Sequence, residues 1–122
     1  MLIATFSIAA HDREAEEWGV AVASKFLAVG AVVPWARAKV GAVATQALAN
    51  VSYGPRGLEL LGGKRSAQEA LDELVSSDEM AEHRQAGIVD FDGKAATYTG
   101  QSCLPWAGGV AGEGFAVQGN IL

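Results

Sequence analysis

The segment from Trp18 to Gln46 constrains the fold of this chain more than any other part of the sequence. After its first eight residues only Arg37 and Lys39 carry charge, and Pro34 prevents a continuous helix. Residues 40–45 alternate small side chains with valine, a pattern that suits a strand covered closely on both faces. The segment therefore predicts a loop or short turn followed by a strand in the centre of a sheet.

Two antiparallel hairpins are predicted around this strand. The apolar runs 2–10 and 18–23 flank a polar link of seven residues, 11–17, and form the first hairpin. The second hairpin joins residues 87–91 to 94–99, because the Asp92-Gly93 dipeptide between them favours a two-residue turn.

Two helices are predicted between the hairpins. Gly54-Pro55 marks the start of one, since proline is tolerated in a first turn, and Gly62-Gly63 ends it. Ser66 and Glu69 have the spacing of a capping box, in which hydroxyl and carboxylate satisfy first-turn amides. Apolar residues then recur at helical spacing, which predicts a second helix over 67–76.

The C-terminal part of the chain combines glycine-rich and apolar segments. Residues 100–114 are predicted as loop, and residues 115–122 begin like a strand. A domain rarely stops on an apolar strand without a turn or polar tail. We therefore expect one domain over residues 1–122, a truncated or cleaved portion that is incomplete at its C-terminus.

Composition narrows the class of protein. Half of the residues are apolar and 19% are charged, which is typical of a packed α+β chain. The net charge of −5 argues against nucleic-acid binding, and the apolar stretch 26–36 is about half as long as a membrane-spanning helix. Cys103 is the only cysteine, and no metal-ligand spacing occurs. We expect a cytoplasmic protein with no metal, cofactor or membrane partner.

Several different short segments, spread along the chain, together carry a family resemblance. They are Thr5-Phe-Ser-Ile8, Trp18-Gly-Val-Ala-Val-Ala-Ser24, Ala28-Val-Gly-Ala-Val-Val-Pro-Trp-Ala-Arg37, Val40-Gly-Ala-Val-Ala-Thr-Gln46, Tyr53-Gly-Pro55, Arg84-Gln85 and Val117-Gln-Gly-Asn120. These words resemble the bacterial family catalogued as domain of unknown function 1028. The likeness covers essentially the whole chain.

The resemblance implies a fold like that of the N-terminal-nucleophile (Ntn) hydrolases. This fold is an αββα sandwich, with two stacked antiparallel sheets between helical layers, and family members continue well past Leu122. An Ntn hydrolase attacks its substrate with the first residue of the first strand, whose free α-amino group acts as the base. Thr5 occupies that position, but residues 2–4 intervene after Met1, so its amine becomes free only after processing. The alternative is an ordinary strand threonine.

Two further residues are candidates for chemistry. In proteasome-like members of the wider fold a lysine at the start of a later strand lowers the nucleophile's pKa, and Lys39 has a similar place. Ser24 ends the second predicted strand, where side chains line clefts, and Lys25 follows it. Adjacent strand residues point to opposite faces, so this pair is poorly placed to cooperate. A solvated lysine at a strand end is the alternative for Lys39.

Polar residues within or near the family words are candidates for a ligand pocket. Their amide, hydroxyl and guanidinium groups can hydrogen-bond a ligand's carbonyl or amide, or can instead satisfy buried backbone groups. The candidates are Gln46, Asn50, Tyr53, Arg56, Arg84, Gln85, Gln118 and Asn120.

Three functions follow from these residues. The first is a hydrolase of an amide or peptide C–N bond, with Thr5 as the Ntn-type nucleophile. The second is a catalytically silent protein that holds a small polar metabolite in the same cleft. The third is an interaction protein, in which apolar surface and open sheet edges produce at least a homodimer.

Overall fold

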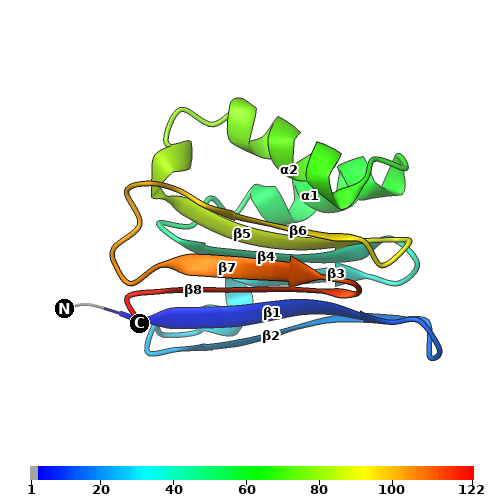
Figure 1. Ribbon diagram of the computed structural model, residues 1–122, viewed down its shortest axis with the longest axis horizontal. Coiled ribbons are helices and arrows are strands. Elements are labelled where there is room, and N and C mark those ends of the chain that lie inside the picture. The colour runs from blue at the N-terminus through cyan, green and yellow to red at the C-terminus, as the bar shows by residue number, and fades with distance from the viewer. Residues whose placement is uncertain (1–2) are drawn as a thin grey trace.

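The predicted strands assemble into two stacked antiparallel sheets in the computed structural model of the chain, which describes residues 3–122 (Figure 1). The sheet that we call the β1 sheet has the order β2-β1-β8-β7. It comprises β1 (Thr5–Asp12), β2 (Glu17–Ser24), β7 (Gly108–Gly112) and β8 (Phe115–Asn120). The chain therefore brings its N-terminal hairpin beside its last strands.

The second sheet, which we call the β4 sheet, has the order β3-β4-β5-β6. It comprises β3 (Pro34–Arg37), β4 (Gly41–Ala47), β5 (Arg84–Asp90) and β6 (Ala95–Thr99). The helices α1 (Tyr53–Gly62) and α2 (Ala67–Ser76) connect β4 to β5 and cover the outer face of this sheet (Figure 1). The predicted α+β class is confirmed.

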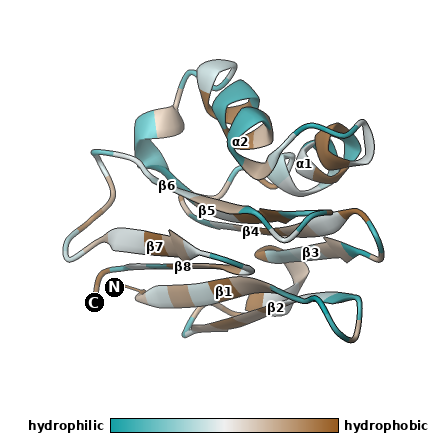
Figure 2. Ribbon diagram, turned by 45° about the vertical axis from the view of Figure 1, so that its right-hand side comes forward, coloured by the Kyte–Doolittle hydropathy of each residue, from teal (hydrophilic) through white to brown (hydrophobic). Residues whose placement is uncertain are grey.

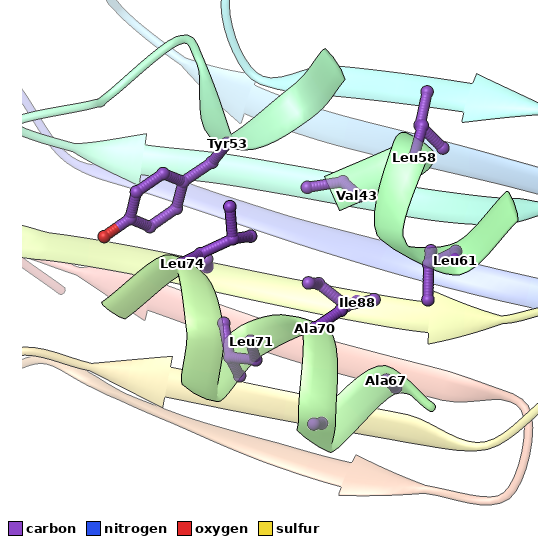
Figure 3. Packing of buried hydrophobic residues seen from close by; sticks show 11 residues of the cluster. Val43, Tyr53, Leu58, Leu61, Ala67, Ala70, Leu71, Leu74 and Ile88 are labelled. Atoms are coloured by element: carbon purple, nitrogen blue, oxygen red, sulfur yellow. The ribbon is translucent and has the colours of Figure 1, made fainter. Parts of the chain in front are cut away.

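The main apolar core lies between these helices and the β4 sheet (Figure 3). Leu61 and Leu74 project from the helices toward Val43 and Ile88 on the strands, and all four side chains are fully buried. The predicted capping box starts α2, because the Ser66 hydroxyl accepts a hydrogen bond from the Glu69 amide at 3.1 Å. Burial of one face therefore supports a helix that its sequence already favours.

The interface between the two sheets is different in character. At one end it packs small apolar side chains, with Ala9, Ala42 and Val89 in contact. At the other end it holds buried polar groups, among them Gln118, which occupies the space beside Gly87. The sheets can approach closely there because Gly87 has no side chain.

The outer face of the β1 sheet carries no helix (Figure 2), and exposed apolar side chains lie on it. Phe6 pairs with Ala23 and Ile8 with Ala21, so these side chains share one face, and Val110 extends it onto β7. Phe6 and Val110 are 55% and 62% exposed. An apolar sheet face of this kind is typical of a surface that another molecule or segment covers.

Two predicted loops contain strands. The prediction of loop or turn before residue 40 misses β3, whose Pro34 is tolerated because it is the first residue of an edge strand. The prediction of loop over residues 100–114 misses β7, which is another edge strand. Its Gly109 lies against Thr97 and Gln118, so a larger side chain there would be excluded. Tertiary packing overrides local sequence in both places.

Neither helix within residues 3–122 is long and apolar enough to cross a membrane.

Substitution of Gly87 tests the close approach of the two sheets. A methyl group added in Gly87→Ala overlaps the carboxamide of Gln118, so we expect a loss of about 1–3 kcal/mol in the free energy of unfolding. Urea denaturation measures this loss. Gly19→Ala is the matched control, because Gly19 also lies on a strand and has no atom within 4 Å of the added methyl. Equal stability of the two variants would contradict this packing.

Candidate functional site

A cavity of about 770 Å³ lies at the end of the sandwich where β1 begins and where β4 and β8 end. Thr5, Gln46 and Asn120 form its buried polar floor. Its walls come mainly from the segment between β2 and β3, the end of β4 with the segment after it, and the loop before β7. Single residues before β1, before β5 and after β8 complete them. Those wall residues are Ile3, Phe26, Val29, Val32, Val33, Ala47, Leu48, Ala49, Val51, His83, Ser102, Cys103, Leu104 and Ile121.

The pairing of β1 with β2 brings Ser24 beside Thr5, although Ser24 itself does not line the cavity. Their hydroxyl oxygens are 2.9 Å apart. Ser24 Oγ donates to the carbonyl oxygen of Ala4 at 3.0 Å and accepts from the Phe26 amide at 3.1 Å. Because a serine hydroxyl has one hydrogen, the Thr5 hydroxyl must be the donor to Ser24. The Thr5 hydroxyl is thus oriented by a second hydroxyl.

Behind the cavity floor lies a buried amide network of Ser7, Gln46, Gln85, Gln118 and Asn120. Gln118 Nε2 donates to Ser7 Oγ at 2.8 Å, and Ser7 Oγ donates to Gln46 Oε1 at 2.6 Å. Gln46 Nε2 and Asn120 Nδ2 both donate to Gln85 Oε1, at 2.7 and 3.0 Å. Gln85 and Gln118 are therefore engaged inside the protein, while Gln46 and Asn120 also reach the cavity.

Asn50, Tyr53 and Arg84 form a separate cluster around the carboxylate of Asp78. Arg84 donates twice to Asp78, at 2.8 and 3.2 Å, and Tyr53 Oη donates at 2.8 Å. Asn50 Nδ2 adds a longer bond of 3.3 Å. The Arg84 guanidinium holds the pKa of Asp78 well below its usual range. Burial raises the pKa of the Tyr53 hydroxyl, and its bond to Asp78 adds to that effect.

This Asp78 cluster supports a wall of the cavity without lining it. Arg84 Nη1 donates to the backbone carbonyl of Leu48, which belongs to the segment after β4. These side chains are therefore used to hold a loop in place. Charge-assisted bonds of this kind are stronger than neutral ones.

Lys39 and Arg56 lie away from the cavity. Lys39 precedes β4 at the end opposite to Gln46, and the five residue steps from Gly41 to Gln46 span roughly 17 Å of strand. The structure therefore does not bring Lys39 to Thr5. Arg56 lies on α1 and donates to Ser77 Oγ at 3.2 Å on the surface.

Three polar residues that line the cavity were not among the sequence candidates: His83, Ser102 and Cys103. Cys103 Sγ donates to the Arg84 carbonyl at 3.3 Å, and burial raises the pKa of its thiol. A raised pKa favours the neutral thiol, which is a poor nucleophile. No local sequence pattern links these residues to Thr5. Ser102 and Cys103 lie about a hundred positions after Thr5, and α1 and α2 separate His83 from it in the sequence. In residues 3–122 no group of three or more His, Cys, Asp or Glu side chains could hold a metal ion.

Comparison with known proteins identifies relatives of this chain. The model of a family of unknown function, DUF1028, matches residues 5–122. The crystal structure of protein SPO2555 from Silicibacter pomeroyi, described as DUF1028, superimposes with a TM-score of 0.93 at 32% sequence identity. That match covers 98% of this chain and 55% of SPO2555, so the chain spans about half the length of that protein. No curated protein matches the chain.

Acid titration tests the Asp78 cluster. The pKa of Asp78 is lower in the folded than in the unfolded protein, so its ion pair stabilises the fold above about pH 4. That stabilisation is lost as the pH falls toward the depressed pKa. Asp78→Asn leaves Arg84 unpaired while 12% of its side chain is exposed, so we expect a loss of about 3 kcal/mol at pH 7.

Urea denaturation between pH 3 and pH 7 measures both effects. The stability of Asp78→Asn is expected to vary less with pH than that of the wild type. Asp72→Asn is the control, since Asp72 lies on the exposed side of α2 and accepts a bond from Gln68. If the free energy of unfolding of Asp78→Asn fell with pH as steeply as that of the wild type, a group other than Asp78 would be responsible for the loss of stability in acid.

Proposed function

This chain belongs to the family of unknown function DUF1028, and from its cavity we propose that it hydrolyses an amide C–N bond with Thr5 as an Ntn-type nucleophile. The observation that carries the proposal is the hydroxyl of Thr5. It lies at the first position of β1, in the floor of the cavity, and is hydrogen-bonded to Ser24. The two stacked sheets with α1 and α2 on one face supply three layers of an Ntn-hydrolase-like αββα arrangement.

Processing is the first requirement of this mechanism. Hydrolysis of the Ala4–Thr5 peptide bond consumes one water, releases residues 1–4 and frees the α-amine of Thr5. The hydroxyl of Ser24 donates to the Ala4 carbonyl at 3.0 Å, which polarises the bond that must be cleaved. The Thr5 hydroxyl lies on the other side of the same serine. Ser24 is thus suited to assist processing and to orient Thr5 afterwards.

Turnover then follows in two steps. Thr5 Oγ1 bonds to the substrate carbonyl carbon, while the α-amine of Thr5 takes the hydroxyl proton. The C–N bond breaks as that proton passes to the leaving nitrogen, and the acyl group remains on Thr5 as an ester. Water, deprotonated by the same amine, attacks the ester and releases a carboxylic acid and the original threonine.

Asn120 is suited to position the substrate. It pairs with Thr5 across β1 and β8, so the two side chains occupy the same face of the sheet. Directly opposite residues of an antiparallel pair have Cα atoms roughly 5 Å apart. An amide hydrogen of Asn120 can therefore reach a carbonyl oxygen that Thr5 attacks. Stabilisation of that oxygen is a large term in acyl transfer.

Intact-mass measurement and two variants test the hydrolase. We expect purified protein to lack residues 1–4, and we expect Thr5→Ala to lose hydrolysis by a factor of about 10⁴ or more. Thr5→Ser retains a hydroxyl and is expected to keep measurable activity. A fully processed Thr5→Ala variant with wild-type turnover would refute the nucleophile. Permanent retention of residues 1–4 together with absent turnover would leave a small-metabolite-binding protein as the function.

A homo-oligomeric interaction function is favoured by a separate observation, the bare apolar face of the β1 sheet. Phe6, Trp106, Val110 and Leu122 are each more than half exposed, and all line a shallow groove on this face. Burying such surface in a homodimer is favourable by roughly 25 cal/mol for each Å². A cytoplasmic location remains a prediction that accompanies both functions.

Light scattering at increasing concentration tests this self-association. We expect a dimer for the wild type and a monomer for Val110→Lys, because a charge on the apolar face opposes burial. Leu27→Lys is the control, since Leu27 is 91% exposed and lies outside the groove. A wild-type monomer at high concentration, or a Val110→Lys dimer, would exclude this face as the contact.

A further inference from the structure

The walls of the cavity beside Thr5 are mostly apolar, whereas its floor is polar. Most lining residues are aliphatic or aromatic, and no Asp, Glu, Lys or Arg lines the cavity in the described part of the chain. Valine side chains before β3 line the cavity together with Leu48, Val51 and Leu104. Apart from the α-amine that processing frees at Thr5, a charged ligand group would find no opposite charge on an Asp, Glu, Lys or Arg side chain there, and burying it unpaired is costly.

The rim of the cavity is exposed as well as apolar. Phe26 is 48% exposed, Leu48 54%, Val51 44% and Leu104 52%. These four residues come from three different segments of the chain, yet all of them line the same cavity. Exposed apolar side chains that gather around a concave surface mark a site for an apolar partner or ligand. The cavity volume of about 770 Å³ is in the range of small-molecule sites.

The buried polar groups of the cavity lie on its floor, whereas the polar residues His83, Ser102 and Cys103 lie in its walls. Thr5, Gln46 and Asn120 are each no more than 7% exposed. The carboxamide of Gln46 is hydrogen-bonded to Ser7 and Gln85, so we assign it to the structure of the floor and not to ligand binding. A ligand that fits this distribution has one amide group at Thr5 and Asn120 and an apolar part that extends along the walls to the rim.

We propose that the substrate is an N-acyl amide whose acyl group is a medium-length apolar chain. This inference rests on the proposed function, because it assigns the scissile carbonyl to Thr5. The acyl group stays bonded to Thr5 as an ester after the amine has left, so the walls around Thr5 contact the acyl chain through both steps. Aliphatic walls then stabilise both transition states in proportion to the apolar area that they bury.

A series of N-acyl p-nitroanilides tests the chain-length dependence. Acetyl, butanoyl, hexanoyl and octanoyl compounds are compared with the γ-glutamyl compound, and release of p-nitroaniline is followed by absorbance. We expect kcat/KM to rise about threefold for each added methylene up to hexanoyl or octanoyl. We expect the γ-glutamyl compound to be turned over at least about a hundredfold more slowly than the octanoyl compound.

A pair of leucine variants separates the cavity from the general surface. Leu48→Asp places a carboxylate on the rim and is expected to lower kcat/KM for the octanoyl compound about tenfold, with little change for the acetyl compound. Leu48 makes its hydrogen bonds with Arg84 and His83 through backbone atoms, which the substitution retains. Leu27→Asp is the matched control, since Leu27 does not line the cavity, and it is expected to change neither rate.

Equilibrium binding separates the two proposals from each other. Calorimetry on Thr5→Ala with the octanoyl and acetyl compounds measures the acyl site without chemistry. If the wild type hydrolyses no compound, but Thr5→Ala binds the octanoyl compound much more tightly than the acetyl compound, the hydrolase proposal is wrong and the acyl-site proposal stands. If γ-glutamyl or acetyl compounds are hydrolysed as fast as octanoyl, the hydrolase stands and the acyl site is wrong. Absence of both hydrolysis and chain-length-dependent binding overturns both proposals.

Discussion

The carboxamide of Gln85 joins the two sheets of this protein, and much of the structure depends on that contact. Its Oε1 accepts hydrogen bonds from Gln46 and Asn120, and its Nε2 donates to the carbonyl of Gly119 at 2.8 Å. Gln85 lies on β5 in the β4 sheet, whereas Gly119 and Asn120 lie on β8 in the β1 sheet. Bonds of this kind are directional, so they specify one stacking of the sheets where apolar contact alone would permit several.

That polar interface has a consequence for where apolar side chains lie. The inner face of the β1 sheet carries Ser7 and Gln118, while its outer face carries Phe6, Ile8 and Val110. At the end of the sandwich that holds Ser7 and Gln118, the polarity of this sheet is therefore opposite to that of a two-layer sandwich with a water-exposed outer face, whereas Ala9 makes its inner face apolar at the other end. In the β4 sheet, by contrast, α1 and α2 cover the outer face and complete a conventional core (Figure 3).

The cavity lies where the amide network reaches the end of the sandwich. Strand pairing positions Thr5 between Ser24 and Asn120, and the Asp78 cluster holds the segment that carries Leu48. The floor is therefore built by rigid elements and the walls by loops, a division common in sites where a scaffold positions polar groups and loops select the ligand. Such a division lets relatives share a floor while their loops differ in apolar character.

Sequence alone determined the parts of this protein whose physics is local. The capping box of Ser66, the Asp92-Gly93 dipeptide and the small-residue pattern of residues 40–45 each act within a few positions, and α2, the second hairpin and β4 formed. The predicted two-residue turn is wrong, because residues 91–94 connect the strands of the second hairpin. Thr5 and Asn120 were also recognised as candidates from family words that span the chain.

Tertiary structure decided the rest. Pro34 and the glycines of β7 disfavour strands locally, and only pairing with β4 and β8 makes them edge strands. Asp78 could not be foreseen as the partner of Arg84 and Tyr53, nor Cys103 as a neighbour of the cavity, because these contacts close long loops. Such contacts depend on how the helices and sheets pack as a whole, and no short stretch of sequence encodes that packing.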